Sequence, residues 1–258
     1  MSSLAKDPRP RGIYLLPNLF TIGSFFAGFY AIISSFAGSY ERAAIAIFVA
    51  MIMDFFDGRV ARMTNTMTAF GAEFDSLADM VSFAVAPAVL AYMWGLSTLG
   101  KFGWLAAFVY MVAVALRLAR FNTQIGNVDK RYFQGLPCPS AAAVVCSFVW
   151  VCYDFDISNK FLVIMLAIFS IIVGVLMVSN VRFRSFKDVQ LKKHVSFVMI
   201  LIVVLVFVLV TVDPPKVLFV VFAGYAISGP IATAWGLQQK KRIRKKLLLR
   251  RSSKHKHG

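Results

Sequence analysis

The chain has few cysteines and few histidines. Its three cysteines, Cys138, Cys146 and Cys152, are odd in number, and none of them forms a C-x-x-C pair. Its three histidines have no partners at the spacing of metal ligands. These shortages argue against a disulfide framework and against a zinc site. We expect the cysteines to be small packing residues.

Long polar stretches are scarce too, because charged residues make up 16% of the 258 positions and hydrophobic residues 59%. The mean hydropathy is +0.72. A membrane-spanning helix needs about 20 apolar residues, and on that measure the sequence predicts an all-α polytopic membrane protein. The first apolar run is too long, and too closely followed by others, for a cleaved signal peptide, so we expect it to remain in the mature protein. Pro87 predicts a kink in the third helix. The eight expected helices cover residues 13–35, 42–62, 75–95, 102–121, 138–154, 161–180, 195–212 and 215–236.

Basic residues are distributed unevenly around these helices. With the N-terminus in the cytoplasm, 24 of the 28 Lys and Arg fall on the cytoplasmic side. The other side holds Arg42, Lys101, Lys160 and Lys216. The positive-inside rule therefore predicts that both termini face the cytoplasm.

The expected domain organisation is a cytoplasmic segment, 1–12, a transmembrane catalytic domain, 13–237, and a basic cytoplasmic tail, 238–258. The tail contributes much of the net charge of +16. Such a tail could bind RNA, but after a membrane span it is better explained by attraction to anionic headgroups, worth about 1 kcal/mol per basic residue. We therefore expect membrane lipids, and no nucleic acid, as its partner.

Acidic residues are few, 12 in all, yet four aspartates fall within residues 54–79. Asp54 and Asp57 are three apart at the cytoplasmic end of the second helix, and Asp75 and Asp79 are four apart at the start of the third. The connection between the helices is short, so they are expected to form an antiparallel hairpin. All four carboxylates should then converge on one point.

Carboxylates at membrane depth are costly, about 2.5 to 3.5 kcal/mol each on insertion scales, and converging anions repel one another. Arg62 is the basic residue on the same stripe, whereas clusters of carboxylate oxygens suit Mg²⁺, Mn²⁺ or Ca²⁺. Two divalent ions would balance the charge. Gly58, Ala61 and Gly71 leave room for a bulky ligand beside them. A single such acid could equally be a packing or proton-relay residue, but four in register indicate a metal site.

The segment resembles the signature of the CDP-alcohol phosphotransferases, D-x2-D-G-x2-A-R-x8-G-x3-D-x3-D, and matches it without a departure. The resemblance implies the fold of that family, a homodimer, and a divalent metal site for Mg²⁺ or Mn²⁺. The matching positions are Asp54, Asp57, Gly58, Ala61, Arg62, Gly71, Asp75 and Asp79.

The resemblance also implies a role for each position. Asp54, Asp57 and Asp75 correspond to metal ligands, and Asp79 to a residue that both contacts a metal and acts as general base. Asn18 lies in a Pro-Asn segment that approaches the nucleotide in the family. The positions that line the cytidine and diphosphate site correspond to Gly58, Ala61, Arg62 and Gly71.

Three other segments, LPNLFT at 16–21, LRLARFN at 116–122 and FQGLPCPSAA at 133–142, resemble a particular branch of the family. That branch transfers a phosphatidyl group from CDP-diacylglycerol to L-serine and releases CMP, in the cytoplasmic membrane of bacteria and archaea. The expected partners are therefore CDP-diacylglycerol, L-serine and CMP.

The acceptor site is expected near Arg117, Arg120 and Asn122, at the cytoplasmic end of the fourth helix. A guanidinium could bind the carboxylate of serine or a lipid phosphate in bidentate fashion. The alternative is that these arginines only anchor the helix at the membrane surface. The same ambiguity holds for Lys130, Arg131, Arg182 and Arg184.

Other functions remain open at this point. The same chemistry could serve another acceptor, such as glycerol 3-phosphate or an inositol phosphate, which would need a denser basic pocket. A cation transporter could use the acidic cluster as its transit site, and a lipid-binding scaffold would need no catalysis. Neither of the last two explains the small residues and Arg62 in register with the acids.

Overall fold

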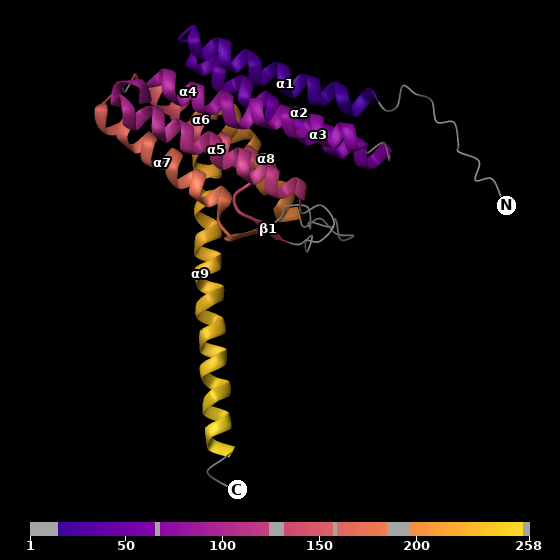
Figure 1. The fold of residues 1–258 in the computed structure, drawn as a ribbon, viewed down its shortest axis with the longest axis vertical. Helices are drawn as coiled ribbons and strands as arrows, with labels where there is room; N and C mark the ends of the chain where they lie inside the picture. The colour runs from indigo at the N-terminus through magenta and orange to yellow at the C-terminus, as the bar shows by residue number, and fades with distance from the viewer. Residues whose placement is uncertain (1–14, 65–67, 124–131, 157–158, 185–196, 255–258) are drawn as a thin grey trace, which may run out of the picture.

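The computed structural model describes residues 15–64, 68–123, 132–156, 159–184 and 197–254, and these residues are almost entirely helical (Figure 1). Two short strands, β1 (Tyr132–Gln134) and β2 (Arg182–Arg184), pair antiparallel. The helices are α1 (Leu15–Phe36), α2 (Tyr40–Thr64), α3 (Ala69–Asp79), α4 (Ala86–Trp94), α5 (Lys101–Thr123), α6 (Cys138–Asp154), α7 (Lys160–Val178), α8 (Phe197–Val212) and α9 (Pro214–Lys254). A π-helical turn, Met80–Val85, joins α3 to α4, and a 3-10 turn, Leu96–Leu99, follows α4.

The chain is an integral membrane protein. Five segments of the described residues are long and apolar enough to cross a bilayer, and large apolar side chains such as Phe26, Trp104 and Val175 are exposed on the bundle surface, as contact with lipid requires. The five segments are Pro17–Phe36, Ala69–Trp94, Lys101–Thr123, Lys160–Val178 and Pro214–Thr233.

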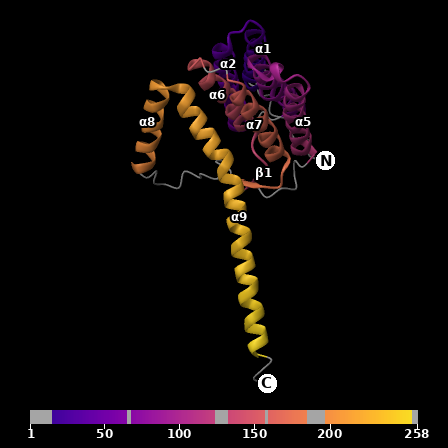
Figure 2. The same ribbon diagram turned by 90° about the vertical axis from the view of Figure 1, so that its left-hand side faces the viewer.

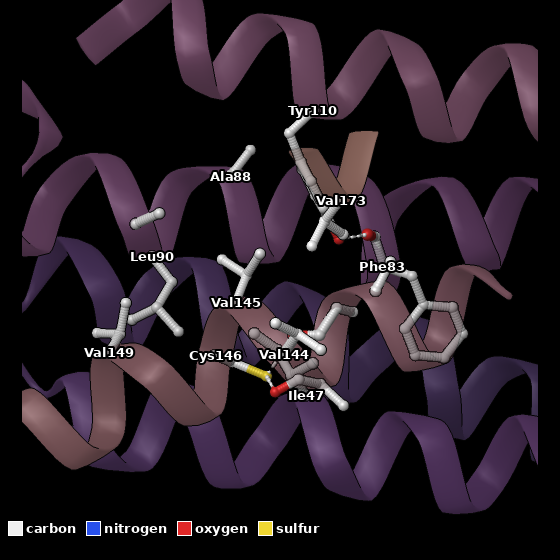
Figure 3. Close-up of a cluster of buried hydrophobic side chains, with 14 of the residues drawn as sticks. Ile47, Phe83, Ala88, Leu90, Tyr110, Val144, Val145, Cys146, Val149 and Val173 are labelled. Carbon is white, nitrogen blue, oxygen red and sulfur yellow. Dashed lines mark hydrogen bonds between the residues drawn. The ribbon is translucent and has the colours of Figure 1, made fainter. Parts of the chain in front are cut away.

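Helix α6 lies inside the bundle. Its residues from Ala141 to Trp150 are all buried, and they pack with α2, α4, α7 and α9. Figure 3 shows Val144, Val145 and Cys146 of α6 in this core. Alanines supply much of the surrounding core, which lets helix backbones approach closely.

The C-terminal helices are arranged differently. Figure 2 shows α8 at the outside of the bundle beside the first part of α9, and α9 continuing as a single long helix away from the bundle. Gly229 of α9 packs directly on Phe183, because a Cβ there would lie 2.2 Å from the aromatic ring. The first part of α9 is thus fixed to the bundle through the strand that carries Phe183.

The eight predicted segments are helical in the structure, with residues 75–95 divided among α3, the π-helical turn and α4, and the predicted all-α architecture is confirmed. Eight membrane-spanning helices were expected, and five segments of the described residues are long and apolar enough to be spans. Two boundaries were wrong. The third helix begins at Ala69 rather than at Asp75, because the Thr68 side chain accepts a hydrogen bond from the amide of Gly71 and caps it. The last helix ends at Lys254 rather than at 236, since the basic segment is rich in good helix formers.

The kink predicted at Pro87 takes the form of the π-helical turn just before it. Pro87 lies in the first turn of α4, where a missing amide hydrogen is tolerated. It cannot donate to the carbonyl of Phe83, four residues earlier. The hydroxyl of Tyr110 on α5 donates to that carbonyl instead, at 2.8 Å, as the dashed line in Figure 3 shows.

Candidate active site

The four aspartates of the motif meet where α2 and α3 lie side by side. Carboxylate oxygens of Asp54, Asp57 and Asp75 all lie within 4.8 Å of one another. Asp79, one helical turn after Asp75 on α3, lies close to Asp54. Asp57 is buried, and the others are half-buried. The predicted convergence of the acidic pairs is therefore confirmed.

A third helix, α1, reaches the same cluster. Thr21 is buried, and its hydroxyl donates to Oδ2 of Asp57 at 2.9 Å; it also lies 3.2 Å from the carbonyl oxygen of Pro17. Sequence reasoning missed this contact, although Thr21 ends the LPNLFT segment. One carboxylate of the cluster is thus oriented from outside the hairpin.

The cluster fits a divalent cation. Its ligand atoms are all carboxylate oxygens, the donors that Mg²⁺, Mn²⁺ and Ca²⁺ prefer. Oδ1 of Asp79 is buried and has no hydrogen-bond partner in the part of the chain that the structure describes. Among the same residues, no lysine or arginine forms an ion pair with Asp57, Asp75 or Asp79. Converging carboxylates without a basic partner are an arrangement that a divalent cation would stabilise.

The predicted nucleotide residues lie on the same helices as the aspartates. A Cβ at Gly58 would meet only the Arg62 guanidinium, at 3.8 and 3.9 Å, so there is open space beside this glycine. A Cβ at Gly71 would lie 3.6 Å from Oδ1 of Asn18, which brings α1 next to α3 here. Arg62 is exposed and Ala61 half-buried. Small residues thus leave space next to the carboxylates.

Arg117 of α5 contacts Cys138, the first residue of α6. Its Nη1 donates to the buried sulfur of Cys138 at 3.2 Å, while its buried Nε has no partner among the described residues. Cys138 is close enough to Asp79 and Asp54 for their charges to act on it. Cys138 was expected only to be a packing residue. Its place in the FQGLPCPSAA segment was the one sign in the sequence that it lies near the site. The Arg117 guanidinium therefore has donors left for a ligand.

Arg120 and Asn122 have different surroundings. The guanidinium of Arg120 donates to the Val178 carbonyl at 3.2 Å and to Oδ1 of Asn180 at 2.7 Å, and so caps the end of α7. Asn122 donates at 3.0 Å to the hydroxyl of Ser76, the residue that follows Asp75 on α3. Asn122 thereby ties the end of α5 to α3, and Arg120 ties it to α7.

Several predicted or weighed positions are outside these contacts. Lys130, Arg131 and the three histidines lie outside the described residues, and Arg182 and Arg184 are described only as backbone in β2.

The fold and the site together define a helical membrane protein with a four-aspartate cluster that could bind a metal. The family model described as CDP-alcohol phosphatidyltransferase matches residues 14–176. This match includes all the residues of the cluster and most of the helical bundle. The chain belongs to the CDP-alcohol phosphatidyltransferase family.

Several relatives are named CDP-diacylglycerol–serine O-phosphatidyltransferase. The protein of Helicobacter pylori is 37% identical over 219 residues, which cover 85% of this chain and 91% of that protein. The protein of Bacillus subtilis is 38% identical over 174 residues, covering 67% and 91%. The protein of Mycobacterium leprae is 32% identical over 239 residues, covering 90% and 79%. The similarity extends over most of the length of these relatives.

Proposed function

We propose that the chain transfers the phosphatidyl group of CDP-diacylglycerol to the hydroxyl of L-serine and releases CMP, as a phosphatidylserine synthase. The observation that carries this proposal is the convergence of four motif aspartates in a chain whose relatives bear that enzyme name. Glycerol 3-phosphate or an inositol phosphate is the alternative acceptor.

Direct attack accounts for the residues present. The serine oxygen forms a bond to the phosphorus that carries diacylglycerol, and the bond from that phosphorus to the oxygen of CMP breaks. A neutral hydroxyl is a weak nucleophile, so its proton must pass to a base. We assign this role to Asp79, whose Oδ1 is buried and has no partner among the described residues. No covalent intermediate with the protein is needed.

Asp54, Asp57, Asp75 and Asp79 are proposed to hold divalent cations, Mg²⁺ or Mn²⁺, as a pair. When bound, such ions hold the diphosphate and offset the charge that grows on the leaving CMP. Thr21 fixes the orientation of Asp57 through its hydrogen bond. Three helices would thus set the position of the ligands.

Gly58, Ala61, Arg62, Gly71 and Asn18 are proposed to line the cytidine and diphosphate. The open space beside Gly58 supports this placement, as does the approach of Asn18 to Gly71. The guanidinium of Arg62 lies over Gly58 and could pair with a phosphate. A β-carbon at either glycine would reduce the space for the ligand.

For the acceptor we favour Arg117 as the group that binds the serine carboxylate. Arg120 and Asn122 would shape the same pocket from behind, since both are held by hydrogen bonds to neighbouring helices.

The active site and both termini are proposed to face the cytoplasm, on the distribution of basic residues. A homodimer, a domain division at residues 13–237 and headgroup binding by the tail also remain proposals.

Replacing Arg117 by lysine is expected to raise the KM for serine about tenfold or more, because a charge-assisted bond is worth about 1.5 to 3 kcal/mol and lysine lacks the bidentate fork. The KM for CDP-diacylglycerol should hardly change. Steady-state kinetics on purified protein measure both constants. Arg42→Lys, at an exposed site at the start of α2, is the control. A rise confined to the KM for CDP-diacylglycerol would instead assign Arg117 to the lipid phosphate.

Transfer from CDP-diacylglycerol to a panel of alcohols tests the function itself. Purified protein with Mn²⁺ or Mg²⁺ is expected to form phosphatidylserine and CMP, and to form little product from glycerol 3-phosphate or inositol phosphate. Failure of L-serine with success of another alcohol would replace the acceptor. Metal flux across proteoliposomes without CMP release would support a transporter instead.

A further inference from the structure

The π-helical turn Met80–Val85 begins directly after Asp79. At its end the amide of Ala86 donates to the carbonyl of Val81, five residues earlier, whereas in an α-helix it would donate to the carbonyl of Ser82, four residues earlier. One extra residue in a helical turn rotates everything before it relative to everything after it by about 100°. The turn therefore decides which way Asp75 and Asp79 face relative to the buried side of α4.

Helix α5 holds the turn on one side. Tyr110 is 1% exposed, and its hydroxyl donates to the Phe83 carbonyl, which Pro87 cannot serve. Because Pro87 has no N–H, the usual α-helical donor to this carbonyl is missing, and the Tyr110 hydroxyl supplies a donor to it. The bond between Tyr110 and Phe83 thus allows the turn and Pro87 to exist together in the core.

Helix α1 holds the turn on the other side. The hydroxyl of Ser82 donates to the carbonyl of Ser24 at 2.9 Å. A Cβ at Gly28 would lie 2.5 Å from the oxygen of Ser82 and 2.7 Å from its Cα, so the two backbones are in direct contact. The turn is clamped between α1 and α5, and α1 also supplies Thr21 to Asp57.

We infer that the turn sets the rotational position of Asp75 and Asp79 relative to α4. We also infer that Tyr110 is a positioning residue, because it holds the turn in place. Phe83 follows Asp79 by four residues, about 6 Å along a helix, so a change in the turn reaches Asp79 directly. The single hydroxyl proton of Tyr110 is donated to the Phe83 carbonyl, so Tyr110 acts on the cluster through the backbone of the turn. This inference rests on the proposed function only in taking the cluster as a metal site.

A matched pair of tyrosines allows a sharp test. Tyr40 on α2 makes the same kind of bond beyond the turn, since its hydroxyl donates to the carbonyl of Met93, near the end of α4, at 2.9 Å. Met93 is 14 residues beyond Asp79, about 21 Å along a helix. Tyr110→Phe and Tyr40→Phe each remove one oxygen and leave the ring in place. Only the first should change the cluster.

The measurements are Mn²⁺ affinity by calorimetry, thermal stability, and transfer kinetics, all on the full chain in detergent. We expect both variants to lose stability, but only Tyr110→Phe to weaken Mn²⁺ binding and to lower kcat, each about tenfold or more. Equal Mn²⁺ affinity and kcat in the two variants, within about twofold, would overturn the inference. If Tyr110→Phe does not fold, Ser82→Ala replaces it, because Ser82 holds the turn from the α1 side. Its Mn²⁺ affinity and kcat are then compared with those of Tyr40→Phe, and the same outcomes support or overturn the inference. A wild-type protein that binds Mn²⁺ but transfers to no alcohol would overturn the proposed function while leaving the affinity comparison valid.

Discussion

Asp79→Asn is expected to lower kcat by about two to four orders of magnitude, the usual contribution of a general base. The amide has nearly the same shape as the carboxylate, but it cannot take up the proton of the serine hydroxyl. Asp79 is also the member of the cluster with a buried oxygen, Oδ1, that has no partner among the described residues. CMP release measures the rate, and binding of CDP-diacylglycerol to the variant should remain close to that of the wild type.

Glu73→Gln is the matched control for this substitution. Glu73 is an exposed acid on the same helix, two residues before Asp75, and the change removes the same charge by the same chemistry. It should leave kcat within about twofold, because exposed surface substitutions are usually small in effect. Asp79→Asn with wild-type turnover would show that another group takes the proton, or that the protein is a lipid-binding scaffold.

Much of the site could be predicted because its signal is local. The spacing of Asp54 and Asp57, and of Asp75 and Asp79, places each pair on one helix face, and the short connection brings the pairs together. Long apolar runs predicted the helices in the same way, and the segment 138–154 agrees with α6 residue for residue. Local patterns of this kind carry over into the folded structure because they depend on helical periodicity alone.

The contacts that orient these residues come from distant parts of the chain. Thr21 is 36 residues from Asp57, and Arg120 is 60 residues from Asn180. Nothing in the sequence near Arg117 or Arg120 distinguishes the arginine that contacts Cys138 from the one that caps α7. Their roles are separated only by the partners that the fold brings to them, Cys138 of α6 for Arg117 and the end of α7 for Arg120.

The π-helical turn is a further feature that could not be predicted from a local sequence pattern. Pro87 indicates that one backbone hydrogen bond is missing, but a kink, a break or a π-turn can each accommodate that loss. The choice depends on Tyr110, which lies on another helix and supplies the missing donor. A buried tyrosine in an apolar helix carries no sign of this role in the sequence.

Asp57→Asn is expected to weaken metal binding without lowering the stability of the metal-free protein. Asp57 is the buried member of the cluster and contacts both Asp75 and the Thr21 hydroxyl. Its replacement removes a metal ligand and one of four negative charges, so the affinity for Mn²⁺ should fall by at least about a hundredfold, more than the loss of an outer hydrogen bond causes. Transfer activity should fall with it.

The metal-free Asp57→Asn protein should nevertheless be at least as stable as the metal-free wild type. Repulsion among the carboxylates is reduced, and the asparagine oxygen can still accept the bond from Thr21. Added Mn²⁺ stabilises a protein that binds it only in the folded state, so the wild type should melt at a higher temperature with the metal and the variant should not. Thr21→Val keeps all four acids and should give an intermediate result, with affinity lowered about 10- to 100-fold. A full Mn²⁺ shift in the melting temperature of Asp57→Asn would place the metal elsewhere, because no site centred on these three helices could lose its most buried carboxylate and still bind the ion unchanged.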